Sequence, residues 1–485
     1  MNTKQMSRSR FKTLVVVLAA GSLALLTAGC DDDNDNGMNT NGGSMGEPPM
    51  IRVVHASPDA PPVDIYAAGT TTPLFEDVAY GETTGYLSVT AGTYDIELRA
   101  AGASPTSPPA YSTGDLAIGE ESTITAVALG LLASSDPADG FRVLPLAEDF
   151  MTASGQSVVR IVHGSADAPT VAIDVGNDGS PEIAALERFA ETGAGGVALP
   201  SGTELQVGIW AGSPLARVTA FTTPALPADT SLFLIATGLV GRAARETDGF
   251  SLLAVGPDGS IGFIRQNPVV YALHASADAP AVDIVVSGGG PELVGDLAFG
   301  QLSAPVQVPP AAYQLDVQAA GSGTTAATVP TPSLSAGERY LAVASGFLSP
   351  AAGEEGFQLL AYRDGFELEM TAPLLRVVHA SPDAPAVDVG VVDGGFQPLA
   401  PFSNLGFAEA SVESGSETPA GLLRIGVAAT GTSTTVAEFD VTTAMGLRAF
   451  AVAAGALSPD AGDEGFGLVV VDTATSPWTA TRIGD

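Results

Sequence analysis

The 485-residue sequence contains few of the residue types from which reactive sites are most often built. It has one cysteine, four histidines and two tryptophans. The cysteine partners of a closed structural zinc site are therefore missing, and two tryptophans are too few for an aromatic carbohydrate platform. We expect Trp210 to be packed and Trp478 to lie in a tail. No phosphate loop, Rossmann fingerprint or paired-carboxylate glycosidase pattern stands out, so these enzyme classes are not indicated.

Positive charge is also scarce, and its distribution is uneven. Four basic residues and no acidic residue precede Cys30; they are Lys4, Arg8, Arg10 and Lys12. Removing residues 1–29 takes these four from the 19 basic residues, leaves all 54 acids, and gives a net charge of −39 without a lysine. Such a surface repels nucleic acid, whose binding depends on Lys and Arg contacts to phosphates. We interpret it as a solvated, aggregation-resistant coat; a surface that collects divalent cations is the alternative.

The N-terminus has the pattern of an export signal. A basic segment is followed by a short apolar run over 13–28, which is too short for a mature membrane span. The run ends in Leu26-Thr27-Ala28-Gly29-Cys30, which resembles a bacterial lipobox except that Thr27 stands where leucine is usual. The resemblance implies cleavage before Cys30 and attachment of membrane lipid to its sulfur and its amine. Two or more acyl chains give stable anchoring.

An acidic segment without apolar periodicity follows the cysteine, and we expect it to be a flexible tether. Asp31 resembles the inner-membrane retention signal of enteric bacteria. The predicted location is therefore the bacterial cell envelope, outside the cytoplasm, with the choice between inner and outer membrane left open.

Each histidine begins a copy of one phrase, His-Ala-Ser-Pro-Asp-Ala-Pro in its first occurrence. The copies begin at His55, His163, His274 and His379. A spacing near 110 residues is too long for a solenoid unit and is about the size of a complete small β-domain. Other landmarks keep the same register, among them an aromatic residue in the middle of each repeat, an alternating strand after it, and a Gly-Phe pair near the end.

We count about seven strands in each repeat and no convincing amphipathic helix. The predicted fold is all-β: four tandem antiparallel β-sandwich domains, immunoglobulin-like or transthyretin-like, after a signal peptide and a flexible tether. Short linkers predict that the domains stack as beads. The predicted segments are 1–29 signal peptide, 30–49 lipidated cysteine and tether, 50–150 repeat 1, 157–258 repeat 2, 268–367 repeat 3, 374–475 repeat 4 and 476–485 tail.

The histidine phrase and the period together resemble the bacterial family of domains of unknown function 4397, over about residues 50–475. The resemblance implies extracytoplasmic, often lipid-anchored proteins with repeated β-domains and no established activity. Repeat 2 departs most from the phrase, with Gly164, Ala166 and Thr170 inside it. It also has Ala172 where the other repeats have aspartate, and we expect Asp174, on the same strand face, to replace that aspartate.

Three interpretations of the phrase compete. In the first, it is a pinned turn: Ser57 and Asp59 bind nearby backbone N–H groups, and His55 locks the loop through Asp59 or a backbone carbonyl. In the second, histidine and aspartates bind a weak metal ion. The weak candidate ligands are His55, Asp59, Asp64, His163, Asp167, His274, Asp278, Asp283, His379, Asp383 and Asp388.

The third interpretation is a hydrolase with Ser57 as nucleophile, His55 as base and Asp64 as orienting group. It lacks a nucleophile elbow and an evident oxyanion loop. Calcium, the remaining cofactor alternative, would favour all-oxygen acidic loops such as 460–464, which lack the full spacing of a known calcium motif.

The sequence therefore predicts a non-catalytic binding, adhesion or structural module of the cell envelope, not an enzyme. It predicts no catalytic residue, no cofactor, lipid attachment at Cys30, membrane lipid and another envelope or surface component as partners, and no nucleic acid. A metal-binding or metal-dependent envelope enzyme that uses the His/Asp phrase is the alternative from another class.

Overall fold

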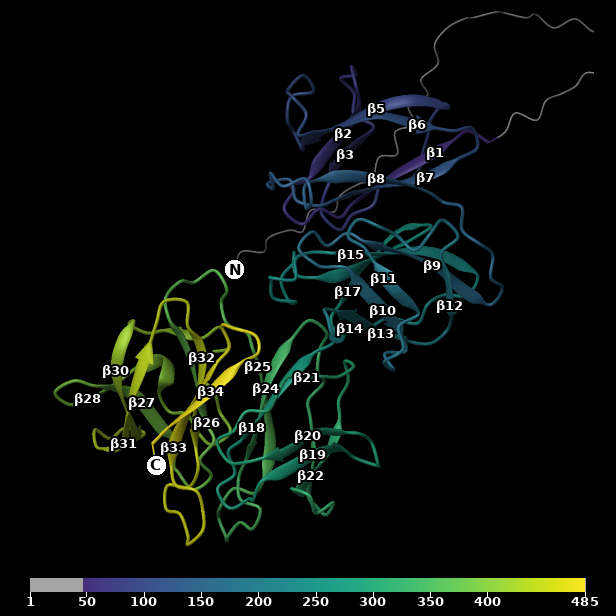
Figure 1. Ribbon diagram of the computed structural model, residues 1–485. Helices are drawn as coiled ribbons and strands as arrows, with labels where there is room; N and C mark the ends of the chain where they lie inside the picture. The colour runs from purple at the N-terminus through teal and green to yellow at the C-terminus, as the bar shows by residue number, and fades with distance from the viewer. Residues whose placement is uncertain (1–46, 485) are drawn as a thin grey trace, which may run out of the picture. The chain divides into compact units, whose positions relative to one another are not determined.

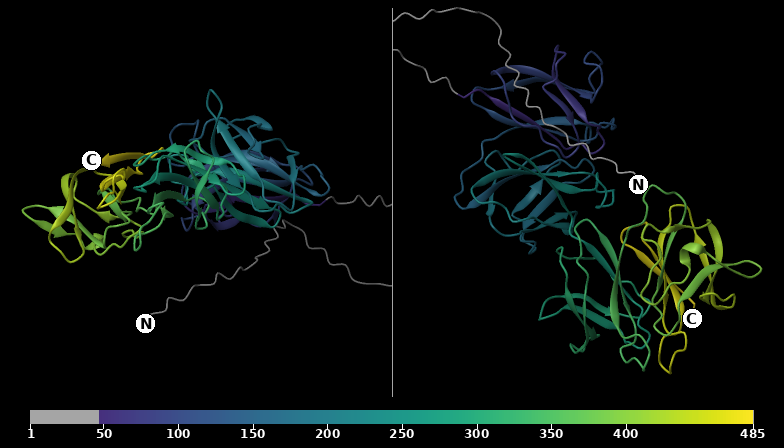
Figure 2. Two further views of the ribbon diagram at one scale, coloured as in Figure 1. Left: turned by 90° about the horizontal axis from the view of Figure 1, so that it is seen from below. Right: turned by 180° about the vertical axis from the view of Figure 1, so that it is seen from behind.

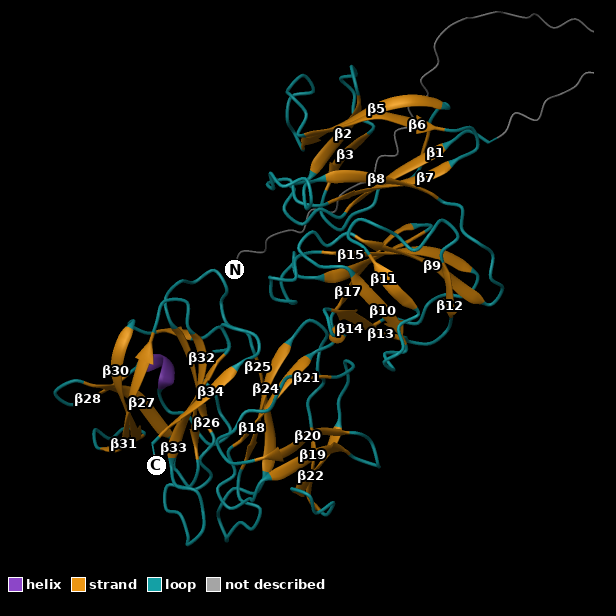
Figure 3. Ribbon diagram, in the orientation of Figure 1, coloured by secondary structure: helices purple, strands orange, loops and turns teal. Residues whose placement is uncertain are grey.

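The computed structural model describes residues 47–484, and strands and loops make up nearly all of them (Figure 3). The predictions for the signal peptide, for Cys30 and for most of the tether fall outside these described residues. Over the part that is described, the one helix is a 3-10 turn, η1 (Ala400–Phe402). None of the helices found between residues 47 and 484 has the length and apolar character needed to cross a membrane.

The strands fall into four consecutive sets, one for each repeat (Figure 1). Repeat 1 contains β1 (Met50–His55), β2 (Val63–Ala67), β3 (Phe75–Val78), β4 (Leu87–Ser88), β5 (Gly92–Ala100), β6 (Tyr111–Ile118), β7 (Thr123–Leu129) and β8 (Arg142–Ala147). Repeat 2 contains β9 (Gln156–His163), β10 (Val171–Val175), β11 (Ile183–Leu186), β12 (Val197–Pro200), β13 (Gln206–Ala211), β14 (Ala216–Thr222), β15 (Thr230–Thr237), β16 (Ser251–Gly256) and β17 (Gly259–Arg265). Repeat 3 contains β18 (Val269–His274), β19 (Val282–Val286), β20 (Glu292–Leu297), β21 (Val306–Gln307), β22 (Gln314–Ala319), β23 (Thr325–Pro330), β24 (Arg339–Ser345) and β25 (Gln358–Arg363). Repeat 4 contains β26 (Leu374–His379), β27 (Val387–Val392), β28 (Phe396–Pro398), β29 (Ser416–Glu417), β30 (Gly421–Ala429), β31 (Thr435–Thr443), β32 (Arg448–Ala454), β33 (Gly467–Asp472) and β34 (Thr479–Ile483).

Each repeat is a sandwich of two sheets, as predicted, and the views in Figure 2 follow each repeat as one run of colour. We call the sheet that holds the strand ending in histidine the histidine sheet, and the other the second sheet. The histidine sheets have the strand orders β4-β1-β7-β8, β12-β9-β15-β16-β17, β21-β18-β24-β25 and β29-β26-β32-β33-β34. The second sheets have the orders β3-β2-β5-β6, β11-β10-β13-β14, β20-β19-β22-β23 and β28-β27-β30-β31.

The strand directions are antiparallel except for one parallel pair in each histidine sheet. In repeat 1 this pair is β1 and β7, with His55 opposite Ala128. The same pairing recurs as β9 with β15, β18 with β24 and β26 with β32. A parallel pair needs a long crossover connection, and here the chain builds the second sheet between the two paired strands. The predicted antiparallel β-sandwich is therefore confirmed, and each repeat adds one parallel pair that the sequence did not indicate.

Two segments that the sequence analysis left outside the domains are strands. Residues 259–265, predicted as part of a linker, form β17, which pairs with β16 in the histidine sheet of repeat 2. Residues 479–483, predicted as tail, form β34, which pairs with β33 in repeat 4. Trp478, which precedes β34, is only 4% exposed, so the prediction that it is a tail residue is wrong.

The repeats do not stack as independent beads, because their histidine sheets pack face to face in two pairs. One hydrophobic cluster takes five buried residues from repeat 1 and five from repeat 2. They are Val54, Ala56, Val127, Leu129 and Leu146, and Val162, Phe233, Ile235, Leu253 and Val255. A second cluster joins repeats 3 and 4 in the same way and includes Trp478. We call these two contacts the pair interfaces.

The strand that ends in histidine is therefore buried on both faces. Val53 belongs to the core between the two sheets of repeat 1, whereas its neighbour Val54 belongs to the pair interface. Val377 and Val378 divide in the same way in repeat 4. Because successive side chains of a strand point to opposite faces, a strand covered on both sides has buried residues at successive positions. The charged residue of β1, Arg52, is itself buried. This explains why β1 and β26 lack the alternation of a half-exposed strand.

Candidate functional site

The four histidine phrases form four nearly identical turns at the ends of their strands. Every histidine ring is buried, with 2% exposure or less. In repeat 1 the Nε2 atom of His55 lies 3.1 Å from the carbonyl oxygen of Pro61, the last residue of the phrase. The corresponding distances are 2.9 Å for His163 to Pro169, 3.0 Å for His274 to Pro280 and 3.0 Å for His379 to Pro385. Since a carbonyl oxygen can only accept, Nε2 carries the proton and donates it.

The histidine backbone fastens a second landmark of the sequence, the aromatic residue in the middle of each repeat. In repeat 1 the carbonyl oxygen of His55 accepts a hydrogen bond from the N–H of Gly81, and the N–H of His55 donates to the carbonyl of Glu82. Gly81 adopts a positive φ of 85°, which suits glycine. The neighbouring Tyr80 packs edge-on to the imidazole, with ring centres 6.3 Å apart. Phe299 and Phe407 pack in the same way in repeats 3 and 4.

Serine and the first aspartate of the phrase hold the loop that follows β7. Ser57 Oγ donates to the carbonyl oxygen of Gly130 at 2.7 Å. Both carboxylate oxygens of Asp59 accept backbone N–H groups, from Leu132 at 2.8 Å and from Ala133 at 2.9 Å. The other repeats repeat the carboxylate contacts through Asp167, Asp278 and Asp383. Ser57 is fully buried and donates to a carbonyl rather than to histidine, so it is not placed as a nucleophile.

The second aspartate of the phrase bridges two other loops. Asp64 accepts the N–H of Asp77 and of Gly102, each at 2.9 Å. Asp283 and Asp388 accept two backbone N–H groups each in the same manner. These N–H groups stabilise the charged form and lower the pKa of both carboxyls below its usual value.

Repeat 2 uses Asp174 for a related purpose. Asp174 is fully buried and accepts the backbone N–H of Asp178 at 3.2 Å and of Gly179 at 2.7 Å. The indole Nε1 of Trp210 donates to the same carboxylate at 3.2 Å. Asp174 therefore holds the loop that directly follows β10, the strand to which it belongs. Asp64 differs, because it binds two loops that are further away in the sequence.

The polar groups of the phrase therefore point to backbone atoms and do not converge on a shared position. Within residues 47–484, no group of three or more His, Cys, Asp or Glu side chains is arranged to hold a metal ion. Nδ1 of His379 accepts the N–H of Ser381 at 3.3 Å. What these side chains do chemically is to hold neighbouring loops in place through hydrogen bonds to their backbone groups. The bond from Ser57 to Gly130 is buried, where leaving the carbonyl unpaired would be costly.

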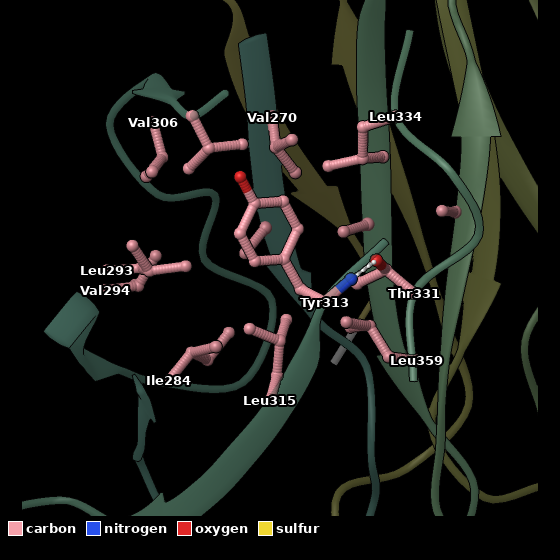
Figure 4. Close-up of a pocket in the computed structure, with 14 residues that line it drawn as sticks. Val270, Ile284, Leu293, Val294, Val306, Tyr313, Leu315, Thr331, Leu334 and Leu359 are labelled. Carbon is pink, nitrogen blue, oxygen red and sulfur yellow. Dashed lines mark hydrogen bonds between the residues drawn. The ribbon is translucent and has the colours of Figure 1, made fainter. Parts of the chain in front are cut away.

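The spaces between the sheets are small and apolar. In repeat 3 a cavity of about 50 Å³ lies between Ile284, Leu315 and Leu359, with Tyr313 beside it (Figure 4). Cavities of about 30 Å³ occupy the corresponding place in the other repeats. Small-molecule sites usually have volumes of about 300–1,000 Å³ and several polar groups. These cavities are packing gaps in the sandwich cores.

Sequence reasoning missed the residues that join the repeats. Thr237 Oγ1 donates to the carbonyl of Ala56 at 2.6 Å, from repeat 2 to repeat 1. Arg52 is 2% exposed, and its Nη1 donates to the carbonyl of Gly256 in repeat 2 at 2.6 Å. The signal that could have indicated this interface is the missing alternation in the strand that ends in histidine, because a strand with one solvent-exposed face alternates.

The burial of the histidines predicts an acid-sensitive fold. Desolvation lowers the pKa of all four rings below the usual 6.5, against the raising effect of the proline carbonyls. A group whose pKa is lower in the folded chain contributes stability that is fully present above its unfolded pKa and is lost as the pH falls from that value through the folded pKa. We expect the urea midpoint to be constant between pH 8 and about pH 7 and to fall as the pH drops below about 6.5, the usual pKa of an unfolded histidine. The urea midpoint of a His55→Gln variant should depend less on pH. If the urea midpoint of the unaltered protein does not change over this pH range, the prediction is contradicted.

Together the fold and the histidine turns define a class: a tandem β-sandwich protein whose most specific phrase serves the fold of each repeat. A family model described as "Domain of unknown function (DUF4397)" matches residues 49–174 and 268–390, just over half of the chain, and the chain belongs to that family. Each matched region runs through one repeat and into the first two strands of its pair partner.

The other comparisons add little. No curated protein matches the chain. A solved structure titled "The Bacillus anthracis TIE protein" matches with 9% sequence identity and a TM-score of 0.15, and covers 79% of this chain. The match covers 64% of that structure's chain, less than two thirds of its length. A similarity at this level carries no argument about function.

Proposed function

We propose that the protein is a lipid-anchored, non-catalytic module of the bacterial cell envelope, which presents a series of paired β-sandwich repeats outside the membrane. The observation that carries this proposal is the use of all four histidine phrases in internal hydrogen bonds. In each phrase, the histidine, the serine and the first aspartate form hydrogen bonds with backbone groups of their own repeat, as His55, Ser57 and Asp59 do in repeat 1. The most specific residues of the chain thus serve rigidity, which suits a spacer or a display scaffold.

The arginines support a role in which fixed joints matter. Between residues 47 and 484 the chain has no lysine, so arginine provides the permanent positive charge there. Several arginines cross from one repeat to the next: Arg52 binds the carbonyl of Gly256, Arg142 lies over Phe189, Arg245 binds the carbonyls of Asp364 and Phe366, and Arg482 lies over Phe299. Cations at joints between acidic repeats offset their mutual repulsion, and the remaining acidic surface disfavours nucleic acid as a partner. The partner of the displayed loops would be another envelope or surface component.

The anchor in this proposal is acylated Cys30. An acyl chain contributes about 0.8 kcal/mol for each buried methylene, so two or more chains hold the protein on a bilayer. The tether that follows the cysteine would carry the repeats away from the lipid surface, which the acidic repeats themselves do not favour.

The test is fractionation of cells that produce the full chain. Unaltered protein is expected in the membrane fraction, and Cys30→Ser is expected in the soluble fraction. Thr27→Leu is the matched control, because it brings the segment closer to the usual lipobox and should leave the protein membrane-bound. Retention of Cys30→Ser in the membrane fraction would contradict the lipid anchor.

The absence of lysine after residue 12 offers a second readout of the same step. If cleavage before Cys30 is followed by acylation of the new amine, the mature protein has no primary amine. Purified protein is then expected to remain unlabelled by an amine-reactive dye, whereas uncleaved protein would be labelled at Lys4 and Lys12. Labelling of mature protein at its first residue would show that the amine is free and would contradict acylation there.

A further inference from the structure

The pair interface has the pattern of contacts that a two-fold symmetric interface has. In such an interface a residue at one position contacts a second position on the partner, and the reverse contact is also made. Thr237 of repeat 2 donates to the carbonyl of Ala56 in repeat 1. Leu129 is the counterpart of Thr237 in repeat 1, because each directly follows the residue that pairs with the histidine. Leu129 packs toward Gly164: a Cβ at Gly164 would lie 3.5 Å from Cδ2 of Leu129. Both directions of the contact are therefore present.

The same two positions meet in the other pair. Ser345 of repeat 3, at the position of Thr237, donates to the carbonyl of Ala380 in repeat 4 at 2.6 Å. Here the donor comes from the first repeat of the pair, whereas in the first pair it comes from the second. Since either member can supply either side of the contact, the surface does not depend on the order of the repeats in the chain.

Side-chain size at these positions differs from repeat to repeat. The largest residue at the position of Thr237 is Leu129, and the residue that faces it is Gly164, the departure from the phrase noted in repeat 2. The other three phrases have alanine there, at Ala56, Ala275 and Ala380. A Cβ at Gly164 would lie 2.9 Å from the carbonyl oxygen of Ala236 in its own repeat, but at an ordinary contact distance of 3.5 Å from Leu129, so the leucine itself does not exclude the alanine of the other phrases.

From these contacts we infer that the histidine sheet is a self-sufficient pairing surface, which a repeat from a second copy of this chain can occupy. The buried apolar residues of the interface and the hydrogen bond from Thr237 lie on the strands of the two histidine sheets or directly after them. The connection between repeats 1 and 2 runs from 148 to 155 and adds Phe150, which packs on Phe233, and Glu148, which pairs with Arg52. Both lie close to β8 and so belong to the repeat 1 side of the interface. The partner that fits an uncovered histidine sheet of repeat 1 is thus repeat 2 of another molecule. This last step rests on the proposed lipid anchor: copies that are concentrated on one membrane exchange pairs and become linked.

The test uses the full chain with Cys30→Ser, so that it is soluble, and a protease recognition sequence inserted after Thr152. After cleavage the two pieces are separated in urea. A tagged N-terminal piece from one preparation is then mixed with an untagged C-terminal piece from another, and the urea is removed. We expect recovery of a one-to-one complex on size-exclusion chromatography, with the tag in the peak of the C-terminal piece.

Two variants, one in each piece, sharpen the result. Leu129→Glu places a charge in the pair interface and should abolish recovery of the complex. Leu422→Glu, made in the C-terminal piece at a residue that is 70% exposed, should leave recovery unchanged. The unaltered pieces decide the question by themselves, so a variant that fails to fold does not affect it. Pieces that remain apart, or an N-terminal piece that only aggregates, would overturn the inference.

Discussion

Replacing Phe233 with alanine is expected to lower the free energy of unfolding by about 3–5 kcal/mol, as for other buried phenylalanines. Phe233 is fully buried in the pair interface of repeats 1 and 2. Its ring packs edge-on to Phe150 with centres 5.1 Å apart, and the guanidinium groups of Arg52 and Arg160 lie 6.0 and 5.8 Å from its centre. The substitution removes contacts with both repeats at once, so both should lose stability.

Urea unfolding followed by hydrogen exchange resolved along the chain would measure this effect. Phe250→Ala is the matched control, because Phe250 is buried in the core between the sheets of repeat 2. We expect Phe233→Ala to accelerate exchange in β1 and β7 as well as in repeat 2, and Phe250→Ala to act first on repeat 2. Unchanged protection of β1 and β7 in the Phe233 variant would mean that the interface adds little stability to repeat 1.

Replacing Glu148 with alanine is expected to cost about 3–5 kcal/mol of unfolding free energy, because it leaves a buried charge without its partner. Glu148 Oε1 lies 3.1 Å from Nη2 of Arg52, whose side chain is 2% exposed. The same carboxylate accepts the hydroxyl of Tyr86 at 2.9 Å and the hydroxyl of Thr125. Burial, and then the charge of Glu148, raise the pKa of Tyr86. Removing the carboxylate thus affects two buried polar groups, on Arg52 and Thr125, and the partly buried hydroxyl of Tyr86.

A double variant distinguishes a lost partner from lost packing. Arg52→Met combined with Glu148→Leu removes both charges and keeps apolar volume, and such replacements are often nearly neutral. We expect it to recover a large part of the stability that Glu148→Ala loses, as measured by urea unfolding. The loss in the single variant should persist in high salt, since buried pairs are little screened. A double variant as unstable as the single one would show that the charge is not the cause.

The repeats, their β-sandwich fold and the family were readable from the sequence. The histidine phrase recurs at a domain-sized spacing, and a period near 110 residues leaves few alternatives to four small β-domains. The interpretation of the phrase as a pinned turn agrees with the geometry: Asp59 binds backbone N–H groups, and His55 binds a backbone carbonyl of its own turn. Short polar side chains next to proline favour local hydrogen bonds of this kind, so the prediction depended on local chemistry.

The ends of repeats 2 and 4 were not readable, because the signal there differs from that of the other repeats. β17 and β34 occur as fifth strands in these two histidine sheets, so alignment of the four repeats does not reveal them. β34 is also preceded by Trp478, which stacks on Tyr271 of repeat 3 with ring centres 4.3 Å apart. A residue near the end of the chain completes an interface with a repeat that begins about two hundred positions earlier, and no local pattern contains that information.

The sequence by itself determined the number of repeats, most of the strands within each and the turn that follows the first strand, because strand periodicity and turn chemistry act over a few neighbouring residues. It also determined the acidic character of the chain, whereas lipid attachment at Cys30 stays a prediction. The tertiary structure alone decided that the histidine sheets pack in pairs, and that Val54 faces another repeat while Val53 faces its own core. The physical reason is that the hydrophobic effect is not directional: an apolar strand face must be buried, but only the fold as a whole determines which surface covers it.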